Sequence, residues 1–332
     1  MPTLFSPLAF AGLRLRNRVA MPPMWSGKAT AEGFVTPAIV EYHRARAAAG
    51  TALIIVEHAF VHPQGRHSST QLGAHDDACV EGLSGLAAAI RAEGAVACLQ
   101  ISHAGARASS GVTGLPVLAP SPVATSRERS PDAPDQLTRP QIDEVVEAFA
   151  NAAARARTAG FEAVEIHAAH GFLLSQFLSP LTNHRTDEYG GDHERRSRIH
   201  LEVLAAVRRR AGADFPLLVR LGMHDERPGG LTLAPACVTA AQLVAAGAAL
   251  IDVSGGLAGS DDPGRGPGYF VGYAEALKEV VDVPVLVAGG IADPRMADLI
   301  IRSRRADIVG IGRAMLDDPE WTRTAAAALD QA

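Results

Sequence analysis

The chain has 332 residues, 47% hydrophobic and 20% charged, with a formal net charge of −5 at pH 7. This composition is typical of a globular protein and excludes a basic surface for nucleic acid. Three widely spaced cysteines, apolar runs too short to cross a bilayer and an N-terminus unlike a secretory signal lead us to expect a cytoplasmic protein without disulfides.

Eight apolar, β-branched runs predict strands, and Ala-rich segments with helical periodicity alternate with them. We expect the strands at 18–23, 52–57, 95–102, 162–167, 216–221, 250–254, 284–289 and 307–312. We expect the helices at 37–49, 77–93, 139–159, 194–211, 235–247, 273–281, 294–304 and 319–329. Glycines at several expected helix ends, as in "AAAGTALIIV", fit C-caps that lead directly into the next strand.

This alternation predicts a (β/α)8 TIM barrel, in which residues 1–332 form one domain. A doubly wound parallel sheet is the alternative, but eight strands in a chain of this length favour the barrel. The connections 103–137 and 168–193, after the third and fourth strands, are long. Because barrels place their active sites at the carboxyl ends of the strands, we expect both to line a pocket, although 103–137 could be a simple surface excursion.

Polar residues at the ends of the expected strands should meet at one mouth of the barrel. Gln100, Arg220 and the histidines of "EIHAAHGFL", His167 and His170, are the main members of this set. Gln100 or Arg220 alone would be interpreted as a structural hydrogen-bonding residue, but together they favour a functional site. The histidines could instead form a structural pair. A metal site is not expected, because the HxxH spacing has no clear third ligand.

The motifs "VAGGI" and "GIGRAM" follow the last two strands and contribute Gly289, Gly290, Gly312 and Arg313. Glycines let backbone N–H groups approach an anion, and an arginine can pair with a phosphate. A phosphorylated ligand is therefore expected at this end of the mouth. The Gln100 amide and the Arg220 cation suit the pyrimidine edge of a flavin, but these arguments alone do not separate flavin mononucleotide (FMN) from a sugar phosphate.

With these residues identified, the chain resembles the old yellow enzyme family of FMN-dependent ene-reductases, in its shorter bacterial branch. The resemblance runs from "LFSPLAFAGLRLRNRVAMPPM" to "GIGRAMLDDPEW", and its most specific stretch is "AGFEAVEIHAAHGFLLSQFLSPLTNHRTDEYGG". It implies noncovalent FMN, with NADPH or NADH as reductant. By the resemblance, FMN contacts Pro23, Met24, Trp25, the His58 backbone, Gln100, Arg220, Gly289, Gly290, Gly312 and Arg313. His167 and His170 would hydrogen-bond the carbonyl or nitro oxygen of the substrate.

The chain departs from the family pattern around the expected substrate pocket, to which we assign Trp25, Gly27, Phe172 and Tyr269. Phe172 stands where the family usually has a proton-donating Tyr. Trp25 replaces a small Thr or Cys beside the flavin, and Gly27 replaces a Tyr that contacts substrate. "HAGAR" carries one residue more than the usual "HAGR", which moves Arg107. The iron–sulfur and second nucleotide-binding regions of the dienoyl-CoA reductase branch are not expected.

The resemblance therefore implies an FMN-dependent reductase of activated C=C bonds, such as those of enones and maleimides, and of nitro compounds. A flavin-dependent desaturase or an amine oxidase/demethylase is the alternative, because oxidation does not need the proton donor that Phe172 lacks. A flavin-binding protein without turnover is a third hypothesis, against which the two histidines argue. We expect a small-molecule substrate, no nucleic-acid or membrane partner, and a homo-oligomer, either a dimer or a tetramer.

Overall fold

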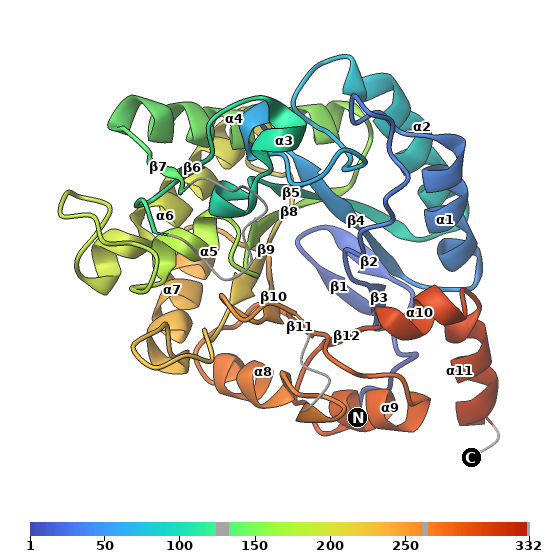
Figure 1. Cartoon of the computed structure of the whole chain (residues 1–332). Coiled ribbons are helices and arrows are strands. Elements are labelled where there is room, and N and C mark those ends of the chain that lie inside the picture. Colours follow the sequence, from blue (N-terminus) through green and yellow to red (C-terminus); the bar gives the residue numbers. More distant parts are fainter. Residues whose placement is uncertain (124–132, 261–264, 331–332) are drawn as a thin grey trace.

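The computed structural model describes residues 1–123, 133–260 and 265–330, and Figure 1 shows helices surrounding a central barrel. In these residues eight parallel strands close into the barrel, and the last strand pairs with the first of the ring. They are β3 (Val19–Met21), β4 (Leu53–Phe60), β5 (Val96–Ser102), β8 (Ala163–Ala168), β9 (Leu217–Gly222), β10 (Leu250–Ser254), β11 (Val285–Val287) and β12 (Ile308–Gly310). The predicted (β/α)8 fold is confirmed, and the doubly wound alternative is excluded.

The predicted outer helices are present, with ends shifted by a few residues. They are α1 (Pro37–Ala48), α2 (Cys79–Ala92), α4 (Arg139–Thr158), α6 (His193–Ala211), α7 (Leu233–Ala245), α8 (Val271–Lys278), α9 (Pro294–Arg302) and α11 (Trp321–Asp330). Helix α1 begins after Thr36, whose side chain accepts from the Ile39 N–H. The glycines predicted to end helices do so in the left-handed region, as at Gly50, with φ +104°, and Gly160, with φ +85°.

The amino ends of the barrel strands are covered by an antiparallel hairpin that the sequence patterns did not predict. Its strands are β1 (Leu8–Phe10) and β2 (Leu13–Leu15). Leu13 and Leu15 are buried in one cluster with residues from the first positions of the barrel strands, such as Leu53. The hairpin therefore seals this end with apolar side chains, and a ligand has access from the opposite, carboxyl end.

The two long connections lie together over the carboxyl ends. The connection after β5 contains α3 (Ser110–Thr113), β6 (Leu118–Ala119) and β7 (Asp135–Gln136), and the connection after β8 contains α5 (Leu173–Leu178). A further short helix, α10 (Arg313–Asp317), follows β12. Part of the predicted connection 103–137, residues 124–132, lies outside the described residues.

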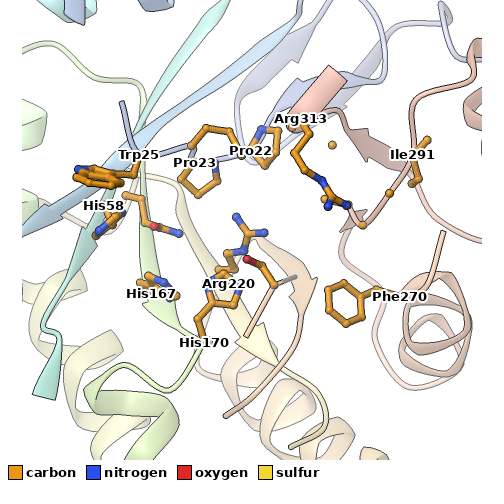
Figure 2. A pocket seen from close by; sticks show the side chains of 18 of the residues that line it. Pro22, Pro23, Trp25, His58, His167, His170, Arg220, Phe270, Ile291 and Arg313 are labelled. Atoms are coloured by element: carbon orange, nitrogen blue, oxygen red, sulfur yellow. The ribbon is translucent and has the colours of Figure 1, made fainter. Parts of the chain in front are cut away.

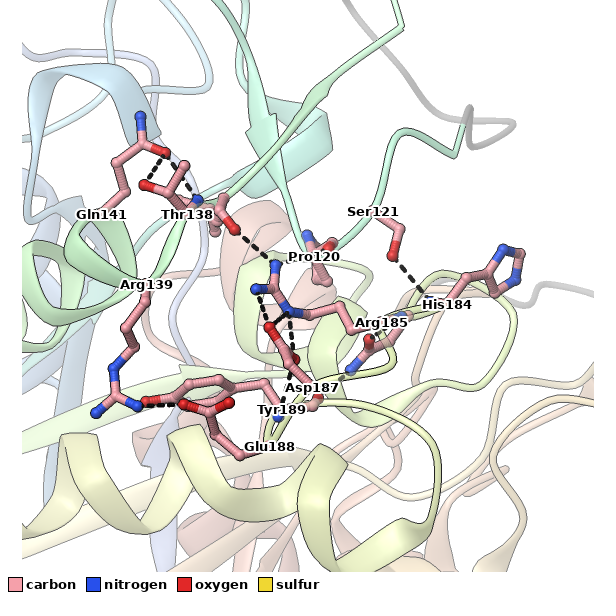
Figure 3. A network of polar contacts seen from close by, with 12 residues as sticks. Pro120, Ser121, Thr138, Arg139, Gln141, His184, Arg185, Asp187, Glu188 and Tyr189 are labelled. Atoms are coloured by element: carbon pink, nitrogen blue, oxygen red, sulfur yellow. Dashed lines mark hydrogen bonds and ion pairs between the residues drawn. The ribbon is translucent and has the colours of Figure 1, made fainter.

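A buried arginine ties these connections to each other (Figure 3). Arg185, in the connection after β8, donates to the carbonyl of Pro120 at 3.1 Å and to that of Leu137 at 2.6 Å. These two carbonyls flank the β6–β7 pair, and the Asp187 carboxylate compensates the guanidinium charge at 2.5 Å. Because a buried charge is stable only when it is paired and hydrogen-bonded, this arrangement fixes both connections over the barrel mouth.

Candidate functional site

A cavity of about 610 Å³ opens at the carboxyl ends of the barrel strands (Figure 2). Its volume lies within the range of small-molecule sites. The sequence-predicted residues that line it are Pro23, Met24, Trp25, His58, Gln100, His167, His170, Phe172, Arg220, Tyr269, Gly289, Gly290, Gly312 and Arg313. The structure thus brings together residues from all parts of the chain, some predicted from the strand ends and others from the family resemblance.

Gly27 is the one predicted pocket residue that the structure does not place in the cavity wall. A Cβ atom on Gly27 would lie 3.5 Å from the Trp25 ring and 3.7 Å from the Thr70 hydroxyl. Its φ of +66° also lies in the left-handed region, where a larger side chain is strained. Trp25, which is 46% exposed, therefore forms this part of the rim itself.

The predicted histidine pair lies where β8 ends. The rings of His167 and His170 are 4.8 Å apart between centroids and nearly perpendicular. The Ala169 N–H donates to His167 Nδ1 at 3.2 Å, so a neutral His167 carries its proton on Nε2. Burial, together with Arg220 and the neighbouring imidazoles, holds the pKa of both histidines well below the usual value. Both rings are consequently neutral hydrogen-bond donors.

His170 is held by several contacts in a conformation that non-glycine residues seldom adopt, with φ +59°. Its N–H donates to the Gly255 carbonyl at 3.0 Å, and its own carbonyl accepts from Arg107 Nη1 at 2.5 Å. Its Nε2 lies 2.6 Å from Ser254 Oγ. Backbone strain of this kind persists where the surroundings over-determine it and is frequent at functional sites.

Beneath the mouth lies a layer of buried charges that the sequence analysis did not identify in full. Arg220, 5% exposed, pairs with Asp252 on the neighbouring strand at 3.4 Å. Gln100 donates its amide to Glu165 at 2.7 Å. Burial raises the pKa of Glu165 well above its usual value, and the nearby Asp252 carboxylate raises it further. Burial also raises the pKa of Asp252, to about 6, while Arg220 opposes this rise, so Glu165 is the member of the pair that holds a proton more readily. Single acidic residues inside otherwise apolar strands were the available signal.

At the glycine end of the cavity, side chains lie close to the backbone of the loops. Gly289 has φ +121°, and a Cβ there would lie 2.8 Å from the Tyr269 ring. A Cβ on Gly312 would lie 3.0 Å from the Met24 sulfur. Tyr269 donates its hydroxyl to the Ser260 carbonyl at 2.7 Å, and Arg313 lies 3.4 Å from that hydroxyl. Tyr269 thus lines the cavity at its glycine end.

Phe172, 4% exposed, lies among imidazole rings. Its ring centroid is 4.6 Å from that of His167, 5.4 Å from His58 and 5.6 Å from His67. The Arg107 guanidinium lies 5.2 Å from the same centroid. His67 and Arg107 also line the cavity, although neither was predicted as a site residue.

Buried Gln176 holds the connection after β5 against the connection after β8. Its amide donates to the carbonyls of Ala104, at 3.1 Å, and Gly171, at 2.6 Å, and its oxygen accepts from the Ala106 N–H at 3.0 Å. The "HAGAR" segment with its additional residue is therefore anchored directly beside Phe172.

Within residues 1–123, 133–260 and 265–330, no helix has the length and apolar character needed to span a membrane. In the same residues, no three or more His, Cys, Asp or Glu side chains gather as a metal-binding group.

Comparison with known proteins identifies the family. The family model for the NADH:flavin oxidoreductase / NADH oxidase family matches residues 3–332. An NADH oxidase of Thermoanaerobacter brockii is 40% identical over 98% of this chain, but the chain spans only 50% of that relative's length. An NADPH dehydrogenase of Bacillus subtilis strain 168 is 38% identical over 98% of this chain and 95% of the relative.

A solved structure of an old yellow enzyme homologue from Zymomonas mobilis superposes with a TM-score of 0.84 at 27% identity, covering 100% of this chain and 93% of that one. The match of the family model over almost the whole chain, the NADPH dehydrogenase relative and this shared barrel agree with the resemblance read from the motifs. The chain therefore belongs to the FMN-dependent NADH:flavin oxidoreductase family, that of the old yellow enzymes.

Proposed function

We propose that the protein is an FMN-dependent oxidoreductase that takes electrons from NADPH or NADH and reduces activated C=C bonds, such as those of enones and maleimides. Nitro compounds are further candidate acceptors. The observation that carries the proposal is the neutral histidine pair at the end of β8, which lines one cavity together with the Arg220 cation and the glycine loops. Bound FMN supplies the chemistry, accepting an electron pair from the nicotinamide and passing it on to the acceptor.

The residues of the cavity fit this cofactor. Gly289, Gly290 and Gly312 have no side chains of their own that would keep a phosphate from the backbone, and a Cβ at these positions would meet Tyr269 or Met24. Arg313 adds a positive charge beside these glycines. Buried Arg220, held by Asp252, places a cation in the cavity that would stabilise negative charge on the pyrimidine edge of a flavin, and the Gln100 amide would pair with the same edge. Pro23, Met24, Trp25 and the His58 backbone complete the proposed contacts with the ring.

The proposed role of His167 and His170 follows from their protonation. A neutral imidazole donates one hydrogen bond, and two such donors aimed at one oxygen polarise the conjugated system attached to it. The same donors stabilise the enolate-like negative charge that develops on that oxygen as the C=C bond is reduced. A cation at this position would bind any anion, whereas two neutral donors favour an oxygen whose charge increases during the reaction.

The two half-reactions test this proposal separately. The purified protein should contain noncovalent FMN, and NADPH or NADH should bleach it under anaerobic conditions. Cyclohexenone or N-methylmaleimide should then restore the oxidised spectrum in a stopped-flow experiment. A protein that takes up no FMN contradicts the cofactor assignment. Bleached flavin that no activated alkene or nitro compound reoxidises contradicts the acceptor class.

Phe172 supports a second candidate, the reverse reaction. A desaturase or an amine oxidase/demethylase removes hydrogen from its substrate and has no need of an acid at position 172. In that case saturated ketones or amines should bleach the flavin anaerobically without a nicotinamide. Bleaching by these compounds, combined with no reoxidation by enones, would favour this candidate over the reductase.

A further inference from the structure

Reduction of a conjugated C=C bond places a proton on the α-carbon, and the residue that provides it is the open question once the proposed function is accepted. The ring of Phe172 carries no acidic hydrogen, so position 172 cannot be the source. Arginines do not release protons in proteins. His167 and His170 are assigned to the substrate oxygen and are neutral. Two sources remain, solvent water in the cavity and another group that lines it, and variants of the lining groups separate them.

Tyr269 does not suit this role, because it lies at the opposite end of the cavity. Its ring packs against the glycine loop, and its hydroxyl proton is donated to the Ser260 carbonyl. Two cavity-lining imidazoles remain beside Phe172, those of His58 and His67. Their ring centroids are 5.4 and 5.6 Å from that of Phe172 and 6.0 Å from each other. The pair therefore lies against the aromatic ring that lacks the hydroxyl.

The backbones of these two histidines are joined by one buried side chain. Gln71, fully buried, accepts from the His67 N–H at 2.7 Å and donates to the His58 carbonyl at 2.9 Å. The pairing of β4 with β5 also shifts register between Val56 and Ala59, and such bulges redirect side chains near active sites. The two hydrogen bonds of the Gln71 amide thus hold His58 and His67, which come from different segments, at one place on the cavity wall.

We propose that the His58–His67 pair supplies the proton that Phe172 cannot. As the β-carbon receives hydride, the π electrons of the C=C bond shift toward the oxygen held by His167 and His170 and form an enolate. One ring of the pair, protonated by solvent that enters the cavity, then gives this N–H proton to the α-carbon, where the enolate electrons form the new C–H bond. The imidazole becomes neutral and regains a proton from solvent. NAD(P)H is the reductant consumed in this balance, and the saturated ketone is the product.

The first test measures reoxidation of pre-reduced flavin by cyclohexenone in His58→Gln, His67→Gln and the double variant. Glutamine preserves hydrogen bonding but is not an acid. The double variant should react about 10²–10⁴-fold more slowly than the parent, since that is the usual contribution of general acid catalysis. The loss in enone reoxidation should exceed any loss in flavin reduction by NADPH, because the latter half-reaction needs no proton donor. Phe172→Tyr should restore the rate in the double variant and add little to the parent. His62→Gln, in the same segment but outside the cavity wall, is the matched control.

The second test does not depend on turnover. In protein labelled with ¹³C-histidine, the Cε1–H signals of His58 and His67 are assigned from their absence in the single variants. Both signals should shift when p-chlorophenol is titrated into the oxidised holoprotein, whereas those of buried His43 and His200 should stay in place. Signals of the pair that do not respond, or a double variant that reduces cyclohexenone as fast as the parent, would overturn the inference. A parent whose reduced flavin no enone reoxidises would instead overturn the proposed function.

Discussion

His170 offers a quantitative test of the histidine pair, because its backbone conformation and its side chain can be perturbed separately. With φ at +59°, it lies in the left-handed region, which costs an ordinary L-residue about 1–2 kcal/mol but is tolerated by Asn. His170→Ala therefore removes the imidazole and keeps the strain, whereas His170→Asn removes the imidazole, relieves the strain and retains an amide donor. The alanine variant should unfold about 2–4 °C below the asparagine variant.

The effect on ligand binding follows from the contacts of the ring. A hydrogen bond to a charged oxygen contributes about 1.5–3 kcal/mol, which corresponds to about 10–150-fold in affinity. His170 must give up its 2.6 Å contact with Ser254 Oγ to bind a phenolate, so its net contribution should lie at the lower end. We expect about tenfold weaker binding for His170→Ala, with His170→Asn between this value and the parent.

Phenol affinities are measured by titrating the oxidised holoprotein with p-chlorophenol and following the long-wavelength charge-transfer band. The effect of backbone strain is measured as the difference in melting temperature between the two variants. His184→Ala, at an exposed histidine in the same connection, is the control for both measurements. Equal melting temperatures for the two His170 variants would refute the argument from backbone strain. Phenol affinities equal to the parent's in both would refute the assignment of His170 to the substrate oxygen.

Three further predictions concern the cofactor, the buried carboxyl groups and assembly. Arg313→Ala should weaken FMN retention by about tenfold or less, measured by ultrafiltration, because Arg313 is exposed and such pairs contribute little. Burial raises the pKa of Glu57 to about 7, so the contribution of this carboxyl group to stability is complete below pH 4.5 and is lost as pH rises through 7. The unfolding free energy measured in urea should therefore fall by about 3 kcal/mol between pH 5 and 8, and Glu57→Gln should reduce this fall. Light scattering should show a homodimer or homotetramer, and a monomeric mass would contradict that proposal.

Most of the fold was predictable, because the barrel depends on the alternation of buried strands with amphipathic helices, and both leave long periodic signals. Strand ends were less predictable. Strand β3 ends at Met21, because Pro22 and Pro23 have no N–H to donate to a neighbouring strand. The prediction extended this strand to residue 23 because both prolines are apolar. The β1–β2 hairpin was missed because strands of three residues are too short to show a period.

The predictability of the site divides in the same way. Side chains at strand ends, such as Gln100, His167 and Arg220, were found because the barrel fixes where strand ends point. His67 and Arg107 were missed because connections carry them. Gln71 holds the first connection through a local contact with the His67 N–H, whereas Gln176 holds the second through a contact with Ala106, 70 residues away. Gly27 does not line the cavity, and its assignment to the substrate pocket stays a prediction. Its position was inferred from relatives with a side chain there, whereas here the Trp25 ring occupies that side.

The cofactor side and the acceptor side of the cavity are held by different kinds of contact. The ladder of the barrel fixes Arg220 and Asp252, which lie opposite each other in the register of β9 and β10, and a change there would leave a buried charge without compensation. Phe172 instead packs in a small apolar cluster with Ala104, Ala108 and Val117. Phenylalanine suits this packing, and the proposed proton donors, His58 and His67, lie 5.4 and 5.6 Å from the same ring between centroids. Loss of the acid at one position and its gain at another are therefore compatible with the same barrel and the same cofactor.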